Sequence, residues 1–312
     1  MSKGIQAIRI MNNQSLNIGI SLGSTNSYLS VLEVGTHIPK VINKFRTEVI
    51  TKQKGCHTSI NPKDRILGFN RLLGTKFDDP IVQKEMNYVP YKIVRAPNGV
   101  DAWVQTSYGH LCSPTQMLTG FFKKIKDLAE LNLGLSVDSK VVVSFPSKFH
   151  CDYIKEVVEA AKIARLGSLS FVHEFTAVAT SYGCTDKEGV FAIVDLGARS
   201  FDVSLFEVVF SRVESSSREY KRGFKLKGIP KRDLFLGGRD FDNVIVEYMM
   251  SEIKGIQGTD LAEDGLVLQR LREVAEECKI QLSSSTEYEI TLPSITSDAS
   301  GEGRLMGKPE FC

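Results

Sequence analysis

Two stretches of sequence decide the fold: "IGISLGSTNSYLSVLE" at residues 18–33 and "AIVDLGARSFDVSLFE" at residues 192–207. They align without gaps, so that Gly23 matches Gly197. Each combines apolar alternation, a turn rich in small residues and renewed alternation, which is the pattern of a β-hairpin. Two such hairpins far apart in the chain predict a duplicated fold, with one hairpin at the base of each of two lobes and a cleft between them.

The segments between the hairpins alternate between helix and strand patterns. Residues 113–134 start with Ser-Pro, have an amphipathic middle and end at glycine, which predicts a helix. Residues 140–146, "KVVVSFP", form a short apolar run typical of a buried strand, and residues 150–167 predict another helix. Residues 168–183 read as a strand that runs into a third helix. This alternation indicates a mixed α/β lobe.

After the second hairpin the chain contains a basic segment and a long amphipathic helix. Residues 217–232 alternate lysine and arginine with apolar residues. This favours an exposed edge strand, where lysine is protective, and a basic docking surface is the alternative. Residues 264–285 predict a helix with one apolar stripe, made of Leu268, Leu271, Ala275, Cys278 and Leu282.

The composition narrows the class of protein. The chain has 312 residues, 42% of them hydrophobic and 24% charged, which is ordinary for a globular protein large enough for two lobes. A formal charge of +2 argues against nucleic acid or a membrane as the main partner. The six cysteines form no C-x-x-C pair, and we expect reduced thiols rather than disulfides or a zinc site.

Five motifs follow one another along the chain. They are "IGISLGSTNS" (18–27), "HEFTAVATSYG" (173–183), "DLGARSFD" (195–202), "LFLGGRDFD" (234–242) and a helix-strand segment (268–295). In order and spacing they resemble the seventy-kilodalton heat-shock chaperones of the DnaK type, and details such as Asn26 and the "LPSI" ending look closest to the bacterial and mitochondrial branch.

The resemblance implies a fold and a division into domains. The fold is α/β, the actin-like and sugar-kinase-like two-lobed ATPase fold with duplicated phosphate-binding hairpins. We expect residues 1–16 to be a disordered leader, residues 17–188 to form the first lobe with an insertion at about 38–110, and residues 189–312 to form an incomplete second lobe. Nothing resembles the family's peptide-binding domain. An incomplete lobe leaves apolar faces uncovered, so we expect aggregation or dependence on a partner.

The resemblance also assigns roles to residues. That family binds ATP or ADP with magnesium between its lobes, and phosphoryl transfer needs bound phosphates, an oriented water and a stabilised metal. The acidic and hydroxyl positions that match its catalytic residues are Glu174, Asp195, Ser200 and Asp202, with Asp195 contacting the metal through water. The positions that match its nucleotide contacts are Gly23, Ser24, Thr25, Asn26, Gly197, Arg199, Gly237, Gly238, Glu276, Lys279 and Ser283.

These assignments have simpler alternatives. The two aspartates of the second hairpin, Asp195 and Asp202, could merely cap its turn. On the predicted helix, Glu276 and Lys279 could be a solvated ion pair three residues apart, which would contribute only a few tenths of a kcal/mol.

Five positions depart from the family pattern. Ser21 stands where an aspartate should face the metal, and Asn70 stands where the catalytic lysine precedes "RLLG". Ala198 and Arg199 replace glycines of the second turn, and Phe175 replaces a proline. These changes predict weakened magnesium binding and impaired hydrolysis. Arg199 either donates hydrogen bonds to an anion or fills the phosphate pocket and strains the turn.

Three functions stay open at this point. The first is a catalytically impaired ATP-binding module, a pseudoenzyme that meets nucleotide or co-chaperones. The second is an active chaperone ATPase that assists the folding of unfolded proteins, and the third is a truncated duplicate without a selected function. Candidate partners are ATP, co-chaperones, nucleotide-exchange factors and unfolded proteins. The branch implies a mitochondrial location, although the presequence pattern is weak, and the cytoplasm is the alternative.

Overall fold

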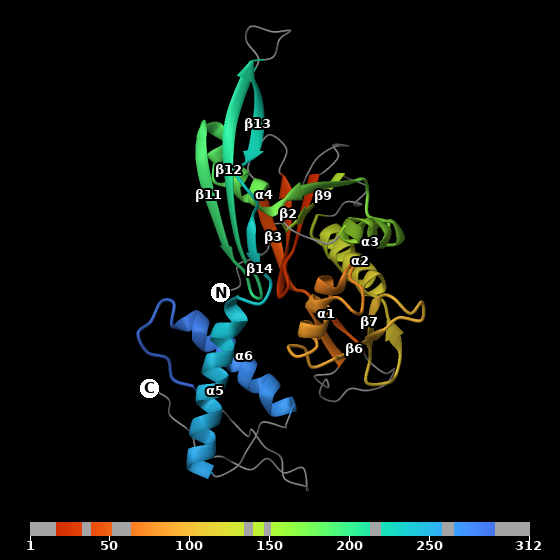
Figure 1. Ribbon diagram of the computed structural model, residues 1–312, viewed down its shortest axis with the longest axis vertical. Helices are drawn as coiled ribbons and strands as arrows, with labels where there is room; N and C mark the ends of the chain where they lie inside the picture. Colours follow the sequence, from red (N-terminus) through yellow and green to blue (C-terminus); the bar gives the residue numbers. More distant parts are fainter. Residues whose placement is uncertain are drawn as a thin grey trace.

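The computed structural model places two larger sheets and a helix pair around a central junction (Figure 1). It describes residues 17–32, 39–51, 64–133, 140–146, 151–212, 220–257 and 265–290. The predicted leader at residues 1–16 and the end of the chain from residue 291 lie outside the described residues.

The first hairpin is the centre of a five-stranded sheet. Strands β1 and β2 pair antiparallel, β3 continues beyond β2, and β9 and β10 lie parallel to β1 in the order β10-β9-β1-β2-β3. The strands are β1 (Asn17–Leu22), β2 (Asn26–Leu32), β3 (Pro39–Arg46), β9 (Lys140–Phe145) and β10 (Leu169–His173). Parallel strands need helical crossovers, and helices α2 (Pro114–Leu133) and α3 (Cys151–Ile163) accordingly surround β9 in the chain.

Helix α2 shows how local sequence defines an element. Ser113 and Gln116 form a capping box: the Ser113 Oγ accepts from the Gln116 backbone N–H at 3.1 Å, and the Gln116 side chain accepts from the Ser113 N–H at 2.9 Å. Pro114 then starts the helix. On the buried face, Phe121 makes edge-on contacts with Phe45 of β3 and with Phe69, and each such buried side chain stabilises the lobe by about 1.5–3 kcal/mol.

Two small sheets and short helices extend this lobe. They are β4 (Glu48–Ile50) with β5 (Arg65–Leu67), the 3-10 turn η2 (Phe69–Leu72), α1 (Pro80–Glu85), and β6 (Lys92–Arg95) with β7 (Ala102–Gln105) and β8 (Leu111–Cys112). Strand β3 belongs to the five-stranded sheet, so the start of the predicted 38–110 insertion is part of that sheet.

The second hairpin forms its own sheet. Strands β11 and β12 pair antiparallel, and both β13 and β14 add to β12. The elements are β11 (Gly189–Leu196), β12 (Phe201–Arg212), β13 (Tyr220–Leu226) and β14 (Lys231–Asp233). Helix α4 (Glu174–Ser181), which is followed by η3 (Cys184–Asp186), covers one face, where Phe175 packs on Phe206.

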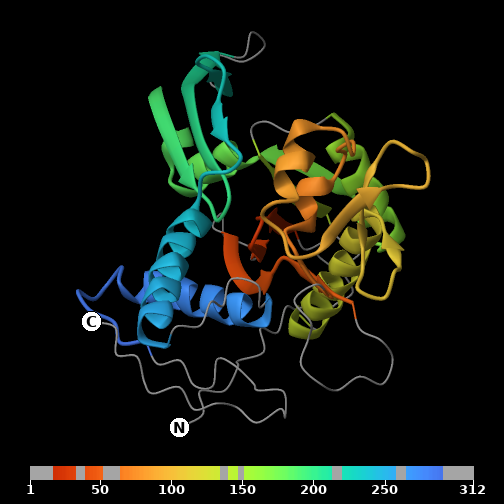
Figure 2. The same cartoon turned by 60° about the horizontal axis from the view of Figure 1, so that its bottom comes forward.

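Helices α5 (Gly238–Gln257) and α6 (Gly265–Gln281) pack on each other beyond β14 (Figure 1). Figure 2 shows the pair crossing next to the first lobe. The predicted stripe of α6 is confirmed at Leu271, Ala275 and Cys278, which are buried. It is wrong at Leu282, which is exposed because α6 ends at Gln281. Within the described residues, no helix is long and apolar enough to cross a membrane.

The face of the second sheet opposite α4 is apolar and open. Val190 and Val194 of β11 are 61% and 64% exposed, and Leu205 of β12, which pairs with Ala192 on the same face, is also exposed. Contiguous exposed apolar surface marks a contact site or an aggregation hazard.

We predict that Val190→Lys combined with Val194→Lys slows aggregation, because both charges add to an exposed face and an edge strand tolerates lysine. The melting temperature should change little, since exposed substitutions usually alter stability by about 0.5 kcal/mol or less. Light scattering during incubation measures the aggregation. Ile193→Lys, on the packed face of the same strand, is the matched control and should destabilise the protein. Unchanged aggregation of the double variant would contradict the prediction.

Candidate functional site

The two hairpin turns contain glycines at which a side chain would be crowded. A Cβ atom at Gly23 would overlap the carbonyl oxygen of Asn26 within the first turn. In the second turn the Gly197 N–H donates to the Ser200 carbonyl at 2.8 Å, and a Cβ atom on Gly197 would lie 3.3 Å from that oxygen. Both turns therefore keep the tight backbone that lets N–H groups approach a ligand.

Gly68 joins the turns of the two hairpins. Its φ of +72° is a backbone conformation that glycine adopts without strain. A Cβ atom there would lie 3.1 Å from the Ser24 carbonyl oxygen of the first turn and 3.9 Å from Nη1 of Arg199 in the second. Residues predicted to hold phosphate thus come from both hairpins to one place, which we call the lobe junction and which includes Gly68, Ser24 and Arg199.

The Leu-Gly-Gly signature docks on the second turn. A Cβ atom on Gly237 would lie 2.6 Å from the backbone of that turn, and the Gly238 N–H donates to the Gly197 carbonyl at 2.9 Å. Lys279 of α6 donates to the Gly238 carbonyl at 3.1 Å and pairs with Asp242 at 2.5 Å. Three segments that are far apart in the chain and that the resemblance assigned to nucleotide binding are thus in contact with one another.

Helix α6 also reaches the first lobe. Glu276 pairs with Arg46 at the end of β3 at 3.0 Å, and Glu273 pairs with Arg65 at 2.5 Å. The ion pairs of Glu276 and Lys279 are thus with other residues rather than with each other. Ser283 lies in the turn after α6, where its hydroxyl donates to the Lys279 carbonyl at 3.1 Å.

The predicted catalytic carboxylates meet under the second hairpin. Asp195 and Asp202 are opposite partners in the β11/β12 register, and Glu174 begins α4 beside them. Burial is the main cause that raises the pKa of Glu174 to about 7. The neighbouring aspartates raise it further, against the opposing charge of Arg232. Burial and the Asp202 charge likewise raise the pKa of Asp195.

An arginine occupies this acidic cluster. Arg232 of β14 pairs with Asp202 in the strand register, and its Nε lies 3.3 Å from an Asp202 carboxylate oxygen. Within the described residues, no group of three His, Cys, Asp or Glu side chains is placed to hold a metal ion directly. The carboxylates present therefore fit an internal guanidinium better than a directly coordinated magnesium ion.

Arg232 also corrects the interpretation of the basic segment 217–232. An exposed edge is right for β13, which ends the sheet and carries exposed Lys225. It is wrong for Arg232, because this side chain is almost fully buried against Asp202.

Arg199 extends from the second turn into the first lobe. Its side chain is only 4% exposed and forms an ion pair with Glu85 at the end of α1. The guanidinium also lies over the ring of Tyr88, 5.5 Å from the ring centroid. Arg71 takes the other carboxylate oxygen of Glu85 at 3.1 Å and donates to the Leu234 carbonyl at 2.7 Å. Two arginines and one glutamate thereby connect the two lobes.

Asn70, which replaces the expected lysine, has a structural contact of its own. It is buried, and its Nδ2 donates to the Leu22 carbonyl at 3.1 Å, which ties η2 to the first hairpin. Ser21 lies opposite Ser144 in the β1/β9 register. The Thr25 hydroxyl is buried and has no hydrogen-bond partner among the described residues. None of these three groups brings a charge to the lobe junction.

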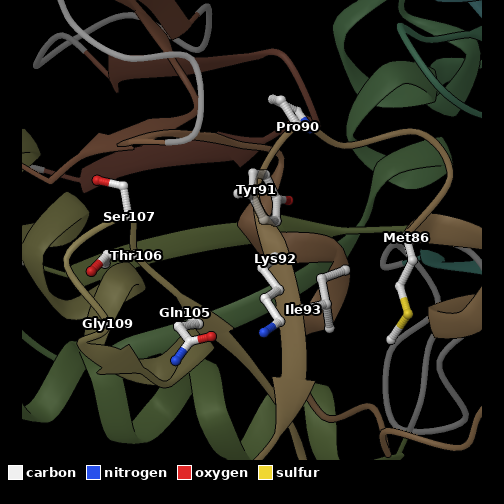
Figure 3. Close-up of a pocket in the computed structure, with 9 residues that line it drawn as sticks. All are labelled: Met86, Pro90, Tyr91, Lys92, Ile93, Gln105, Thr106, Ser107 and Gly109. Carbon is white, nitrogen blue, oxygen red and sulfur yellow. The ribbon is translucent and has the colours of Figure 1, made fainter. Parts of the chain in front are cut away.

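A separate depression of about 710 Å³ lies on the first lobe (Figure 3). Figure 3 shows Lys92 of β6 and Gln105 of β7 side by side, with Met86 farther along the wall. It contains none of the residues that the sequence assigned to nucleotide binding.

Sequence reasoning missed the residues that neutralise the site. Glu85 and Arg71 lie in the segment interpreted as an insertion, and Arg232 lies in the basic segment. The sequence did contain a sign of added positive charge, because Arg232 and Arg239 stand on either side of the Leu-Gly-Gly signature. Their partners come from other elements, so spacing alone could not identify the pairs.

The chain is similar to known heat-shock proteins over nearly its whole length. A family model described as "Hsp70 protein" matches residues 17–308. The mitochondrial heat shock 70 kDa proteins of Pisum sativum and Solanum tuberosum are each 42% identical to this chain in an alignment of 303 positions that covers 92% of it. The chain spans only 42% of the length of these two relatives. The matches confirm the actin-like ATPase fold that the resemblance implies.

We predict that Glu85→Gln lowers the free energy of unfolding by about 3–5 kcal/mol, because it leaves two buried arginines without a counter-charge. Chemical denaturation measures this loss. Asp101→Asn is the matched control, since it removes the exposed Lys76–Asp101 pair and should cost about 1 kcal/mol or less. Combining Glu85→Gln with Arg199→Met should recover part of the loss, and equal effects of Glu85→Gln and Asp101→Asn would refute the buried pair.

We also predict that stability falls as the pH rises from about 4.5 to 7. The pKa of Glu174 is higher in the folded chain, at about 7, so the folded state binds more protons in this window and loses up to about 1.4 kcal/mol per pH unit. Glu174→Gln should flatten this part of the stability profile, as measured by denaturation at a series of pH values. Glu159→Gln, an exposed change on α3, is the control, and a slope unaffected by Glu174→Gln would contradict the assignment.

Proposed function

Because this chain belongs to the Hsp70 family, we propose that it is an ATP-binding chaperone-type module whose hydrolysis is impaired. In this proposal the lobe junction recognises nucleotide or its phosphates, and the lobe surfaces meet co-chaperones or nucleotide-exchange factors. The mitochondrial relatives favour a mitochondrial location. The proposal covers the nucleotide-binding part, since the chain matches less than half the length of those relatives.

The single observation that carries the proposal is the position of Arg199. Its guanidinium extends out of the second phosphate turn and is neutralised by Glu85. A cationic side chain held there takes up space beside Gly68, where the two turns approach each other. Of the two hypotheses for this residue, its pairing with Glu85 favours the steric one for a nucleotide that carries magnesium.

The acidic cluster supports the same conclusion. Glu174, Asp195 and Asp202 would order water and a hydrated metal, but Arg232 already compensates part of their charge. A divalent cation would have to compete with a covalently attached guanidinium. Losing one well-placed charged group typically lowers a rate by about 10²–10³, and Ser21 and Asn70 are two further losses.

The adenosine side of the site is better preserved. Lys279 is held near Gly238 and the second turn, and Glu276 is oriented by Arg46. These contacts hold Lys279 beside the second turn and Glu276 beside the end of β3 without ligand. We therefore propose that nucleoside recognition survives better than phosphate and magnesium recognition.

We predict that the unaltered protein binds ADP weakly and without dependence on magnesium, and that Arg199→Gly raises the affinity measured in the presence of magnesium by at least tenfold. Isothermal titration calorimetry with and without magnesium measures both. Ala198→Gly is the matched control, because it frees the same turn but keeps the guanidinium. Tight magnesium-dependent binding with ATP turnover by the unaltered protein would instead show an active chaperone ATPase.

A further inference from the structure

The lobe junction contains more guanidinium groups than carboxylates. Glu85 offers two oxygens, and Arg199 Nη1 and Arg71 Nε take one each. The second terminal nitrogen of Arg199, Nη2, is buried and has no hydrogen-bond partner among the described residues. Since Arg199 itself is 4% exposed, water does not readily satisfy that donor.

The backbone of a further arginine lies beside the residue that carries this orphaned donor. Arg239 is in the first turn of α5, and its backbone N–H donates to the Ala198 carbonyl at 2.9 Å, directly beside Arg199. The contacts of the described residues give its guanidinium neither a hydrogen bond nor an ion pair. Burial is the first cause that lowers the pKa of Arg239 to about 10, and the charges of Arg199 and Arg272 follow.

The charge count shows what the cluster lacks. Arg71, Arg199 and Arg239 contribute three positive charges and Glu85 contributes one negative charge, so about two positive charges stay uncompensated in a partly desolvated place. A buried charge without a partner costs several kcal/mol, and guanidiniums in such places normally pair with carboxylate or phosphate.

We propose that Arg199 Nη2 and Arg239 form a binding site for a phosphate-class oxyanion that is taken up without magnesium between the two lobes. The inference rests on the proposed function in that it specifies the ligand of the same junction. Guanidinium groups donate in a planar fork that matches two oxygens of a tetrahedral anion. The arginines supply the positive charge that magnesium would otherwise bring, and they repel a divalent cation.

The site would link α5 of the second lobe to the Glu85 cluster of the first. An anion accepting from both Arg199 and Arg239 joins the N-terminal turn of α5 to a residue already paired with α1. A ligand that binds only the folded state stabilises it by mass action. Free phosphate and the phosphate chain of a nucleotide have the same binding chemistry, and the experiment below distinguishes them.

The test measures the melting temperature of the full chain in EDTA at constant ionic strength while chloride is exchanged for inorganic phosphate, pyrophosphate or ATP. We expect a saturable rise with phosphate or pyrophosphate. Arg239→Gln should weaken the apparent affinity at least tenfold. The same variant should melt higher than the unaltered protein in chloride, because it removes an uncompensated buried charge. If Arg239 were merely structural, its replacement would not both weaken the response to the anion and raise the melting temperature in chloride.

Arg270→Gln is the matched control, since it makes the same change on the exposed side of α6 and should keep the full response. Arg239→Lys retains the charge without the fork and should fall between the two. A response to phosphate or pyrophosphate assigns the site to free phosphate, and an Arg239-dependent response to ATP alone assigns it to the nucleotide chain. The inference is overturned if no anion shifts the melting temperature, if Arg270→Gln weakens the response equally, or if binding requires magnesium.

These outcomes separate the inference from the proposed function. Phosphate binding that depends on Arg239, together with ATP turnover in magnesium, would keep the anion site and reject impaired hydrolysis. If the protein showed neither phosphate binding nor ATP turnover, the anion site would be rejected and the proposal of impaired hydrolysis would stand.

Discussion

The interaction on which the structure depends is the buried carboxylate of Glu85 between two arginines. Arg71 comes from the same lobe and Arg199 from the opposite hairpin, so one carboxylate connects both halves of the duplicated fold. Breaking a buried pair of this kind is far more costly than losing an exposed one. The relative position of the lobes is therefore coupled to a residue in the turn that the fold otherwise offers to phosphate.

The same replacement of ligand charge by arginine occurs twice. Arg199 stands in the second phosphate turn, and Arg232 stands among the carboxylates that would organise a hydrated metal. Each is nearly buried and each has an acidic partner. The chain thus carries permanently the positive charge that a bound metal would bring. Both the impaired hydrolysis and the metal-free anion site that we propose rest on this substitution.

Much of the fold could be predicted from the sequence, because its determinants are local. The two hairpins, the capped helix α2 and the short central strand β9 each show their period and their end signals within a few residues. The apolar stripe of α6 failed only at Leu282, past the end of the helix. The motif order indicated which distant segments meet, as the contacts of Gly238 with Gly197 and Lys279 demonstrate.

By itself the sequence determined the duplicated hairpins, the family and the positions where charged residues depart from its pattern. Only the tertiary structure decided what those charges do. Arg199 pairs with Glu85, which is 114 residues away in the chain, and Arg232, which the sequence assigned to an exposed strand, lies opposite Asp202 because β14 adds to β12. Propensity and periodicity act over neighbouring residues, whereas the pairing of buried charges depends on distances that exist only in the folded chain.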